Sequence, residues 1–273
     1  MRPLEHLRIG VLEGRLRDEA TALIERLGGE AVRAPAVREV RQPEASRDAV
    51  RQLASGSYDL AIFLTGAGAT ALLQDADELG VLSAVRDALK KITVACRGPK
   101  PLAALKRHGI IASVTTVKPH TSSELLAALA PLDLVKASAL LVHYGERQTD
   151  LANALRLRVA ALDEACPYVW QLPDDPQPLA SLIVEILNGG VDALLVTSQV
   201  QCRHLFQVAA EMRLTHELTA ALSRDVVVAV VGPVSAAAAK QFGITPDVMP
   251  AAPNMASLVT AVGDYFKLLR DQL

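Results

Sequence analysis

The stretch Val228–Ala238, with the sequence VAVVGPVSAAA, decides the fold class. It begins as a short Val/Ala run, turns at Gly232-Pro233, and continues as an alanine-rich segment that ends at Gly243-Ile244. A buried strand followed by a tight turn and a helix is one half of a βαβ unit. The stretch therefore predicts a parallel sheet covered by helices.

The same alternation of apolar runs and helical patterns extends along the whole chain. The runs that we expect to form strands are Ile9–Leu12, Leu60–Leu64, Ile92–Ala95, Ala139–Val142, Ala193–Val196 and Val226–Val231. Hydrophobic residues make up 51% of the chain but aromatic residues only 3%, which suits Val/Leu-rich strands under Ala/Leu-rich helices. We therefore predict an α/β fold.

The chain also repeats itself at an offset of about 133 residues. The matching pairs are Tyr58–Phe63 with Val191–Val196, Arg97–Lys100 with Val231–Val234, and Thr121–Leu126 with Asn254–Val259. Repeats this long are whole domains, because solenoid units have far shorter periods. The sequence thus predicts two similar domains.

Two segments are expected to cross between these domains. Ala34–Pro43 and Pro167–Pro173 are extended in character and bounded by prolines, which suits edge or linker strands. We predict that the two segments pair as a short ladder.

Composition excludes several classes of protein. A net charge of −2 gives no basic footprint for nucleic acid. The N-terminus Met1–His6 lacks the apolar core of a secretory signal, and no apolar run approaches the roughly 18 residues of a membrane span. We therefore expect a soluble, cytoplasmic protein without nucleic-acid or membrane partners.

Cysteine and histidine spacing gives no sign of a metal site. Cys96, Cys166 and Cys202 are far apart, and the histidines lack spacings such as H-E-x-x-H. We expect free, mostly buried thiols and no metal.

Loops rich in Gly, Thr and Ser follow the expected strands. They are Glu13-Gly14-Arg15, Thr65-Gly66-Ala67-Gly68, Arg97-Gly98-Pro99-Lys100, Thr121-Ser122-Ser123, Tyr144-Gly145-Glu146, Thr197-Ser198-Gln199 and Gly232-Pro233-Val234-Ser235. Ligands of open α/β sheets bind outside the carboxyl ends of the strands. We expect each loop to open a helix and to offer unpaired N–H groups to an anion. Helix capping alone is the competing explanation for each loop.

One of these loops also matches a nucleotide-binding pattern. Gly66–Ala71 fits G-x-G-x-x-A after a strand, but the next strand ends at Ala95-Cys96-Arg97 without the acidic residue that binds a ribose. The chain has neither a P-loop nor a G-x-S-x-G elbow. Nicotinamide binding is therefore the weaker hypothesis.

The order of units, the Gly232-Pro233 turn before an alanine helix and Gly243-Ile244, and Tyr168 in the return segment together resemble the uroporphyrinogen-III synthase family. The resemblance covers essentially the whole chain. It implies two flavodoxin- or Rossmann-like domains with parallel sheets, joined by a two-stranded linker ladder. By this resemblance, residues 1–36 and 174–273 form one discontinuous domain, 42–167 form an inserted domain, and 37–41 and 168–173 are linkers.

The resemblance implies a hydro-lyase that needs no cofactor. Such an enzyme cyclises hydroxymethylbilane to uroporphyrinogen III, with loss of water and inversion of ring D, in the biosynthesis of heme, siroheme and cobalamin. We expect a monomer that exchanges its substrate and product with the preceding and following pathway enzymes. The substrate carries many carboxylates, which matches loops that offer many N–H donors.

The resemblance also assigns roles to residues. Tyr168 matches a tyrosine that recurs in the family, and we expect its phenol to protonate the departing hydroxyl. Arg15, Arg97 and Lys100 are expected to pair with substrate carboxylates. The other expected substrate-binding residues are Thr65, Gly66, Ala67, Gly68, Gly98, Thr121, Ser122, Tyr144, Gly145, Thr197, Ser198, Gln199, Gly232, Pro233 and Ser235.

Three loops depart from the family pattern. Glu13-Gly14-Arg15 stands where a Thr-Arg pair is usual, Leu64-Thr65-Gly66 where a Thr-Ser pair is common, and Ser235 where threonine is usual. Two alternatives therefore stay open: a non-catalytic regulator of the same fold that senses tetrapyrroles, and a generic two-lobed protein that binds small molecules.

Overall fold

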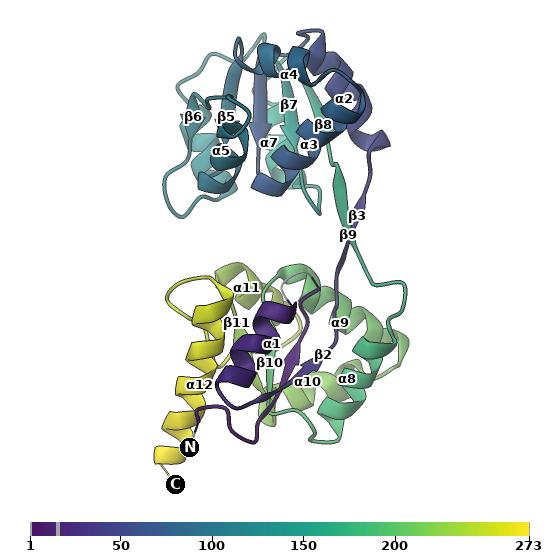
Figure 1. Ribbon diagram of the computed structural model, residues 1–273, viewed down its shortest axis with the longest axis vertical. Helices are drawn as coiled ribbons and strands as arrows, with labels where there is room; N and C mark the ends of the chain where they lie inside the picture. The colour runs from purple at the N-terminus through teal and green to yellow at the C-terminus, as the bar shows by residue number, and fades with distance from the viewer. Residues whose placement is uncertain (1, 15–16, 273) are drawn as a thin grey trace. The chain divides into compact units, whose positions relative to one another are not determined.

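The computed structural model describes residues 2–14 and 17–272. Its internal contacts divide the chain into two compact units (Figure 1). Unit 1 comprises Met1–Arg38 and Gln171–Leu273, and unit 2 comprises Glu39–Trp170. The domain boundaries inferred from the family resemblance, at residues 36, 42, 167 and 174, stay a prediction.

Unit 1 is built on a four-stranded parallel sheet. In spatial order its strands are β11 (Val227–Val230), β10 (Ala193–Val196), β1 (Arg8–Val11) and β2 (Glu30–Arg33). Helices cover both faces of the sheet. They are α1 (Arg17–Arg26), α8 (Gln177–Leu187), α9 (Gln199–Glu211), α10 (Thr215–Arg224), α11 (Pro233–Gln241) and α12 (Met255–Asp271).

Alternate residues of β10 show how this sheet is buried on both sides. Leu194 and Val196 pack into the core that lies under α8, α9, α10 and α11. Ala193 and Leu195 pack into the opposite core, under α1 and α12. A strand with both faces covered needs apolar residues at every position. This is why the central strands stand out in the sequence as continuous apolar runs.

Unit 2 is built on a five-stranded parallel sheet. In spatial order its strands are β6 (Val114–Thr115), β5 (Thr93–Cys96), β4 (Leu60–Phe63), β7 (Ser138–Val142) and β8 (Ala161–Ala165). One face packs on α2 (Glu44–Ala54), α3 (Gly66–Glu78), α4 (Leu82–Leu89) and α5 (Pro99–Lys106). The other face packs on α6 (Ser122–Leu129) and α7 (Thr149–Arg156).

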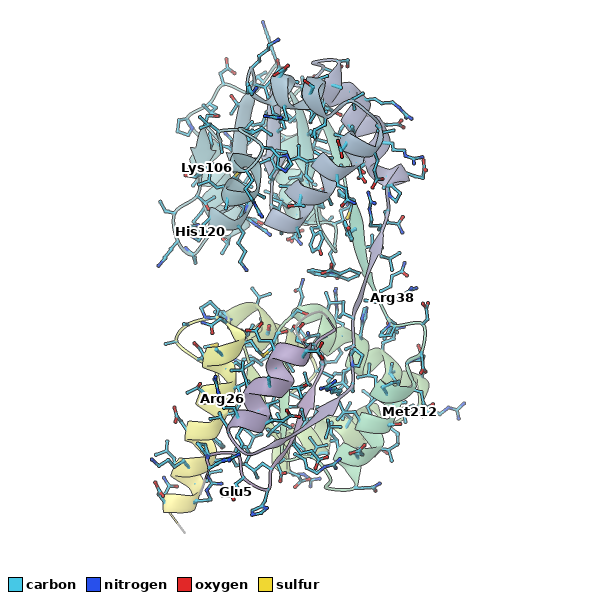
Figure 2. All side chains as sticks on the ribbon, viewed as in Figure 1. Glu5, Arg26, Arg38, Lys106, His120 and Met212 are labelled. Carbon is cyan, nitrogen blue, oxygen red and sulfur yellow. The ribbon has the colours of Figure 1, made fainter. Side chains whose placement is uncertain are left out.

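The two crossing segments pair with each other, as predicted. β3 (Arg38–Arg41) and β9 (Tyr168–Gln171) form a two-stranded sheet. Arg38, labelled in Figure 2, donates from Nε to the carbonyl oxygen of Leu172 at 3.3 Å and forms an ion pair with Asp174 at 2.7 Å. Arg41 holds the other end of β3 to α3, through ion pairs with buried Asp75 and with Glu78.

The internal repeat predicted from the sequence is present in the structure. α3 (Gly66–Glu78) and α9 (Gln199–Glu211) are both 13 residues long and open after equivalent strands, β4 and β10. Thr65 and Ser198 cap these helices, each accepting a hydrogen bond from a backbone N–H of the first turn. The two units are therefore similar α/β folds with parallel sheets, as the repeat predicted.

Candidate functional site

The strand order places the topological switch point of unit 2 between β4 and β7. These strands are neighbours in the sheet although β5 and β6 lie between them in the chain. In open α/β sheets, ligands bind outside the carboxyl ends of the strands at such a point. Here the ends carry residues 65–68, after β4, and residues 143–145, after β7.

Close packing brings these two loops together. A side chain added at Gly68 would lie 3.0 Å from the carbonyl oxygen of His143 and 3.4 Å from Cβ of Tyr144. The hydroxyl of Thr65 accepts the N–H of Gly68 at 3.0 Å and so caps α3. Among the described residues, the N–H groups of Gly66 and Ala67 donate to no protein acceptor. Two amides therefore point from the start of α3 without a partner.

The contacts continue from β4 to β5 and β6. A side chain at Gly66 would lie 2.8 Å from the carbonyl oxygen of Lys100, in the first turn of α5. Gly98 has a φ of 99°, a left-handed conformation, and contacts the ring of His120, which Figure 2 labels. His120 in turn shares a hydrogen bond of 2.9 Å with the hydroxyl of Thr116. The expected binding loops of unit 2 thus form one continuous arc.

Arg97 contributes one of the positive charges of this arc, beside Lys100 in the first turn of α5. Its guanidinium is partly buried and donates to the hydroxyl of Ser122 at 3.4 Å. In the described part of the chain it forms no ion pair. Burial lowers the pKa of Arg97, because a guanidinium removed from water loses hydration of its charge. Such a group is suited to hold a carboxylate bidentately.

An aromatic group adjoins the arc. The ring of Tyr144 lies 5.5 Å from that of Tyr168 and 5.8 Å from that of Trp170, centroid to centroid. Gly145, with a φ of 81°, passes directly beneath Trp170: an added Cβ would lie 2.2 Å from the indole. The hydroxyl of half-buried Tyr168 contacts no described residue by hydrogen bond. It is therefore available to a ligand.

The loop of residues 144–146 corrects one expectation. It does not open a helix: α7 begins at Thr149, after Gln148 as its N-cap residue. The loop instead turns toward β9, where Gly145 N–H donates to Tyr168 O at 2.9 Å and Trp170 N–H donates to Gly145 O at 3.0 Å. Backbone pairing with β9 thus displaces the start of the helix.

At the switch point of unit 1, between β1 and β10, several of the expected donors already have acceptors within the protein. The carboxylate of Glu13 accepts from Thr197 Oγ1 and from Gln201 Nε2, the latter at 2.9 Å. The N–H groups of Thr197 and Ser198 donate to Gln201 Oε1 at 2.7 and 3.3 Å. Gln199 follows in the first turn of α9. These polar groups of the loop therefore bond to neighbouring side chains of the protein, as the capping alternative predicted.

The remaining expected residues are placed at helix starts. Gly232 is the N-cap residue of α11, followed by exposed Pro233 and buried Ser235. Thr121 caps α6 in a capping box with Glu124, so this loop stabilises the start of the helix. The hydroxyl of Ser122 in addition accepts a hydrogen bond from Arg97. Arg15 lies outside the described residues.

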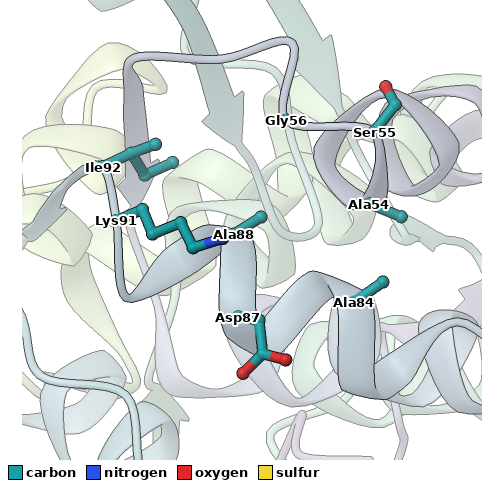
Figure 3. A pocket seen from close by; sticks show the side chains of 8 residues that line it. All are labelled: Ala54, Ser55, Gly56, Ala84, Asp87, Ala88, Lys91 and Ile92. Carbon is teal, nitrogen blue, oxygen red and sulfur yellow. The ribbon is translucent and has the colours of Figure 1, made fainter.

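A separate hollow of about 350 Å³ lies at the other edge of the unit 2 sheet (Figure 3). It is lined by Ala54, Ser55, Gly56, Ala84, Asp87, Ala88, Lys91 and Ile92. These residues precede β4 and β5 or belong to α2 and α4. The hollow is therefore distinct from the arc at the carboxyl edge.

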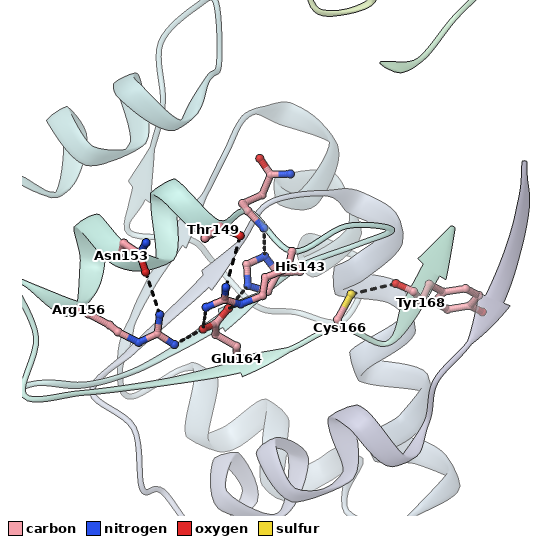
Figure 4. Close-up of polar contacts among 9 residues, drawn as sticks. His143, Thr149, Asn153, Arg156, Glu164, Cys166 and Tyr168 are labelled. Atoms are coloured by element: carbon pink, nitrogen blue, oxygen red, sulfur yellow. Dashed lines mark hydrogen bonds and ion pairs between the residues drawn. The ribbon is translucent and has the colours of Figure 1, made fainter. Parts of the chain in front are cut away.

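Sequence reasoning missed a polar cluster behind the arc. Glu164 on β8 accepts from Nε2 of His143 at 2.9 Å and from Arg147 at 2.7 and 2.8 Å, and it pairs with Arg156 (Figure 4). The sequence predicts an anion-binding loop at Glu13-Gly14-Arg15 but does not indicate that the Glu13 carboxylate accepts from Thr197 and Gln201. The strand order, once known, marks both positions, because Glu13 and His143 follow strands that border switch points.

Neither the cysteines nor a metal cluster nor a membrane-spanning helix contributes to the site among the described residues. Cys96 and Cys202 are buried free thiols, as expected, and burial raises their pKa to about 12 and about 11. Among the described residues no cluster of His, Cys, Asp or Glu could hold a metal ion. Within the same part of the chain, every helix is too short or too polar to cross a membrane.

Comparison with known proteins gives consistent matches. The family described as "Uroporphyrinogen-III synthase HemD" matches residues 18–260. A putative uroporphyrinogen-III synthase of Methanothermobacter thermautotrophicus is 30% identical over 251 residues, 90% of this chain and 94% of its own. The uncharacterised protein YjjA of Bacillus subtilis is 28% identical over 261 residues, covering 95% and 96% of the two chains.

Solved structures agree with these matches. A mutant uroporphyrinogen III synthase from the extremely thermophilic bacterium Thermus thermophilus superposes with a TM-score of 0.76 at 28% identity, covering 97% of this chain and 99% of its own. The similarity covers both units, so both have counterparts in the Thermus thermophilus protein.

Proposed function

Because the chain belongs to the uroporphyrinogen-III synthase family, we propose that it converts hydroxymethylbilane into uroporphyrinogen III. The reaction is a cyclising hydro-lyase step: the terminal hydroxyl leaves as water, and ring D is inverted as the macrocycle closes. The protein acts in the cytoplasm as a monomer. It receives its substrate from the preceding pathway enzyme and releases its product to the following one. The division into domains at residues 36, 42, 167 and 174 is part of this proposal.

The arc at the carboxyl edge of unit 2 is the observation that carries the proposal. It combines unpartnered N–H groups at Gly66 and Ala67 with the unpaired guanidinium of Arg97 among the described residues. The substrate is a flexible polycarboxylate, and a protein with a net charge of −2 attracts it only through such local donors. Several carboxylates held at once would fix the chain in one fold, which lowers the entropic barrier to ring closure.

Tyr168 is the proposed catalytic acid. Its ring is held against Tyr144, and its hydroxyl is not used by any described residue. A phenol in this state can donate a proton to the departing hydroxyl of the substrate, so that water and an azafulvenium cation form. The electron-rich ring D then attacks this cation. A spiro intermediate forms, fragments and closes again with ring D inverted.

The isomer formed from freshly generated hydroxymethylbilane tests the function. The bilane closes spontaneously to isomer I, so an excess of isomer III over the protein-free sample supports the proposal. Formation of isomer I alone would reject it and favour the binding-only alternatives.

Replacing Tyr168 with phenylalanine tests the acid. The variant removes the hydroxyl but keeps the ring against Tyr144, so kcat should fall about a hundredfold or more while KM stays within about twofold. Tyr265→Phe, on α12 of unit 1, is the matched control and should keep full activity. Unchanged kcat in Tyr168→Phe would reject Tyr168 as the acid.

A further inference from the structure

Glu164 links three parts of unit 2 that follow one another in the chain. On β8, its carboxylate accepts from His143 at the end of β7, from both Nε and an Nη atom of Arg147 in the following loop, and from Arg156 on α7 (Figure 4). Hydrogen bonds of this charged kind are among the stronger ones in proteins. Glu164 therefore ties the strand end, the loop and the helix to one edge strand.

His143 uses both nitrogens of its ring. The side chain is 1% exposed. Nδ1 accepts the backbone N–H of Gln148 at 3.2 Å, so Nδ1 carries no proton, while Nε2 donates to Glu164 at 2.9 Å. This arrangement requires the neutral ring with its proton on Nε2. His143 thus spans the loop of residues 144–148 from its first residue to its last.

The loop held in this way carries the aromatic group. Gly145 exchanges backbone hydrogen bonds with Tyr168 and Trp170, at 2.9 and 3.0 Å, and lies directly beneath the indole. Tyr144 contacts both rings and also packs against Gly68 at the start of α3. A change in the path of this loop must therefore move Tyr168 relative to the arc.

We propose that His143 is a positioning residue, which, through its two hydrogen bonds to Gln148 and Glu164, fixes the loop of residues 144–148 and thereby the place of Tyr168. The inference rests on the proposed function for its catalytic consequence. Its structural part, the coupling of His143 to the aromatic group, stands without it.

The charges around His143 favour the neutral ring. Burial lowers its pKa, the contact with Glu164 raises it, and the charges of Arg147 and Arg97 lower it. Glu164 faces the ring from β8, Arg147 from the loop itself, and Arg97 from the end of β5. The ring can therefore serve as a fixed acceptor for Gln148 at neutral pH.

Trp170 provides a readout that does not need substrate. It is the single tryptophan of the chain, and it contacts the loop through Tyr144 and Gly145. Two substitutions separate the bonds of His143. In His143→Gln the amide can still donate to Glu164 but no atom accepts from Gln148, whereas in His143→Asn the amide oxygen can accept from Gln148 but does not reach Glu164. His216→Gln, an exposed histidine on α10 of unit 1, is the control.

Fluorescence emission and quenching of Trp170 should be measured beside kcat and KM, with circular dichroism to establish folding. For His143→Gln we expect longer-wavelength emission, easier quenching, and a fall in kcat of about ten- to a hundredfold with KM within about twofold. His143→Asn should lie between this variant and the unmodified protein, and His216→Gln should match the unmodified protein. If His143→Gln does not fold, Glu164→Gln replaces it as the test. This variant weakens the hydrogen bonds to Arg147, and it should shift Trp170 emission in the same direction.

The two hypotheses fail in different ways. Unchanged Trp170 emission in folded His143→Gln would overturn the positioning role, whatever happens to kcat, because His143 would then act other than through the loop. A shift of Trp170 emission in a protein that forms only isomer I would support the positioning of the loop and reject the proposed function.

Discussion

Replacing Gly145 with alanine should displace Trp170 and destabilise unit 2. Gly145 has a φ of 81°, and a Cβ built on it would lie 2.2, 2.3 and 2.6 Å from three atoms of the indole. Carbon atoms in ordinary contact lie about 3.5–4.0 Å apart. The ring must therefore move by more than about 1 Å.

Gly56 offers a matched control in the same unit. Its φ is 77°, but an added Cβ would have no atom within 4 Å. In Gly56→Ala only the left-handed backbone is strained, at about 1–2 kcal/mol, of which about 0.4–1 kcal/mol is offset by the stiffer unfolded chain. Gly145→Ala carries this cost and in addition about 1–3 kcal/mol for the overlap with Trp170. We expect Gly145→Ala to lose about 2 kcal/mol more than Gly56→Ala.

Urea unfolding followed by far-ultraviolet circular dichroism measures the two free energies, and Trp170 emission reports where the ring has gone. If the indole swings into solvent, part of the energetic difference disappears, but the emission moves to longer wavelength. Equal stabilities together with native Trp170 emission in Gly145→Ala would refute the close contact of Gly145 and Trp170.

Two further predictions concern charge. Burial alone would raise the pKa of Glu164, but hydrogen bonds from Arg147, His143 and Arg156 lower it to about 2. The stabilisation is therefore complete when the pH is above the ordinary glutamate pKa of about 4.5, and it is lost as the pH falls from there toward 2. It amounts to at most about 3 kcal/mol. The arginines are half exposed, and solvent screening reduces this figure further. Glu164→Gln should flatten the acid limb of stability plotted against pH, and an unchanged limb would contradict the assignment. Asp75→Asn, which removes the buried charge that pairs with Arg41, should cost about 2 kcal/mol by urea unfolding, whereas the exposed control Asp48→Asn should cost less than about 0.5; equal costs would argue against a structural role for the buried pair.

The central strands could be predicted because burial on both faces of the sheet determines their sequence. Ala193–Val196 was predicted with the bounds of β10, since a strand buried on both faces needs an unbroken apolar run. The edge strands β2, β6 and β8 escaped prediction for the same reason. β8, with the sequence ALDEA, is largely exposed or half-buried, so no apolar run marks it.

The site was less predictable than the fold. The Gly and Thr loops showed where helices begin, and Thr65 and Ser198 are indeed caps. Ser198 and Gln201 form a capping box of the S-x-x-Q kind, so local sequence does indicate that Gln201 accepts from the N–H of Ser198. Local sequence does not show that Glu13, which follows β1, accepts from the Thr197 hydroxyl and the Gln201 amide, because that contact depends on the pairing of β1 with β10.

The Glu164 cluster shows the same limit more sharply. His143 and Glu164 are 21 residues apart in sequence, and they meet because β7 and β8 pair in a register that sets Glu164 opposite Leu141, two residues before His143. Nothing in the spacing of histidines or glutamates indicates this contact, since the register comes from the sheet as a whole.

The parallel pairing of β1 with β10 has a consequence for how the protein is made. Arg8 N–H donates to the carboxylate of Asp192 at 2.7 Å, across 184 residues of chain, whereas the sheet strands of unit 2 all lie within residues 60–165. During synthesis the ribosome releases every strand of that sheet before β10 emerges. We therefore expect unit 2 to fold before β1 can pair with β10, so that the sheet of unit 1 is completed only after the sheet of unit 2.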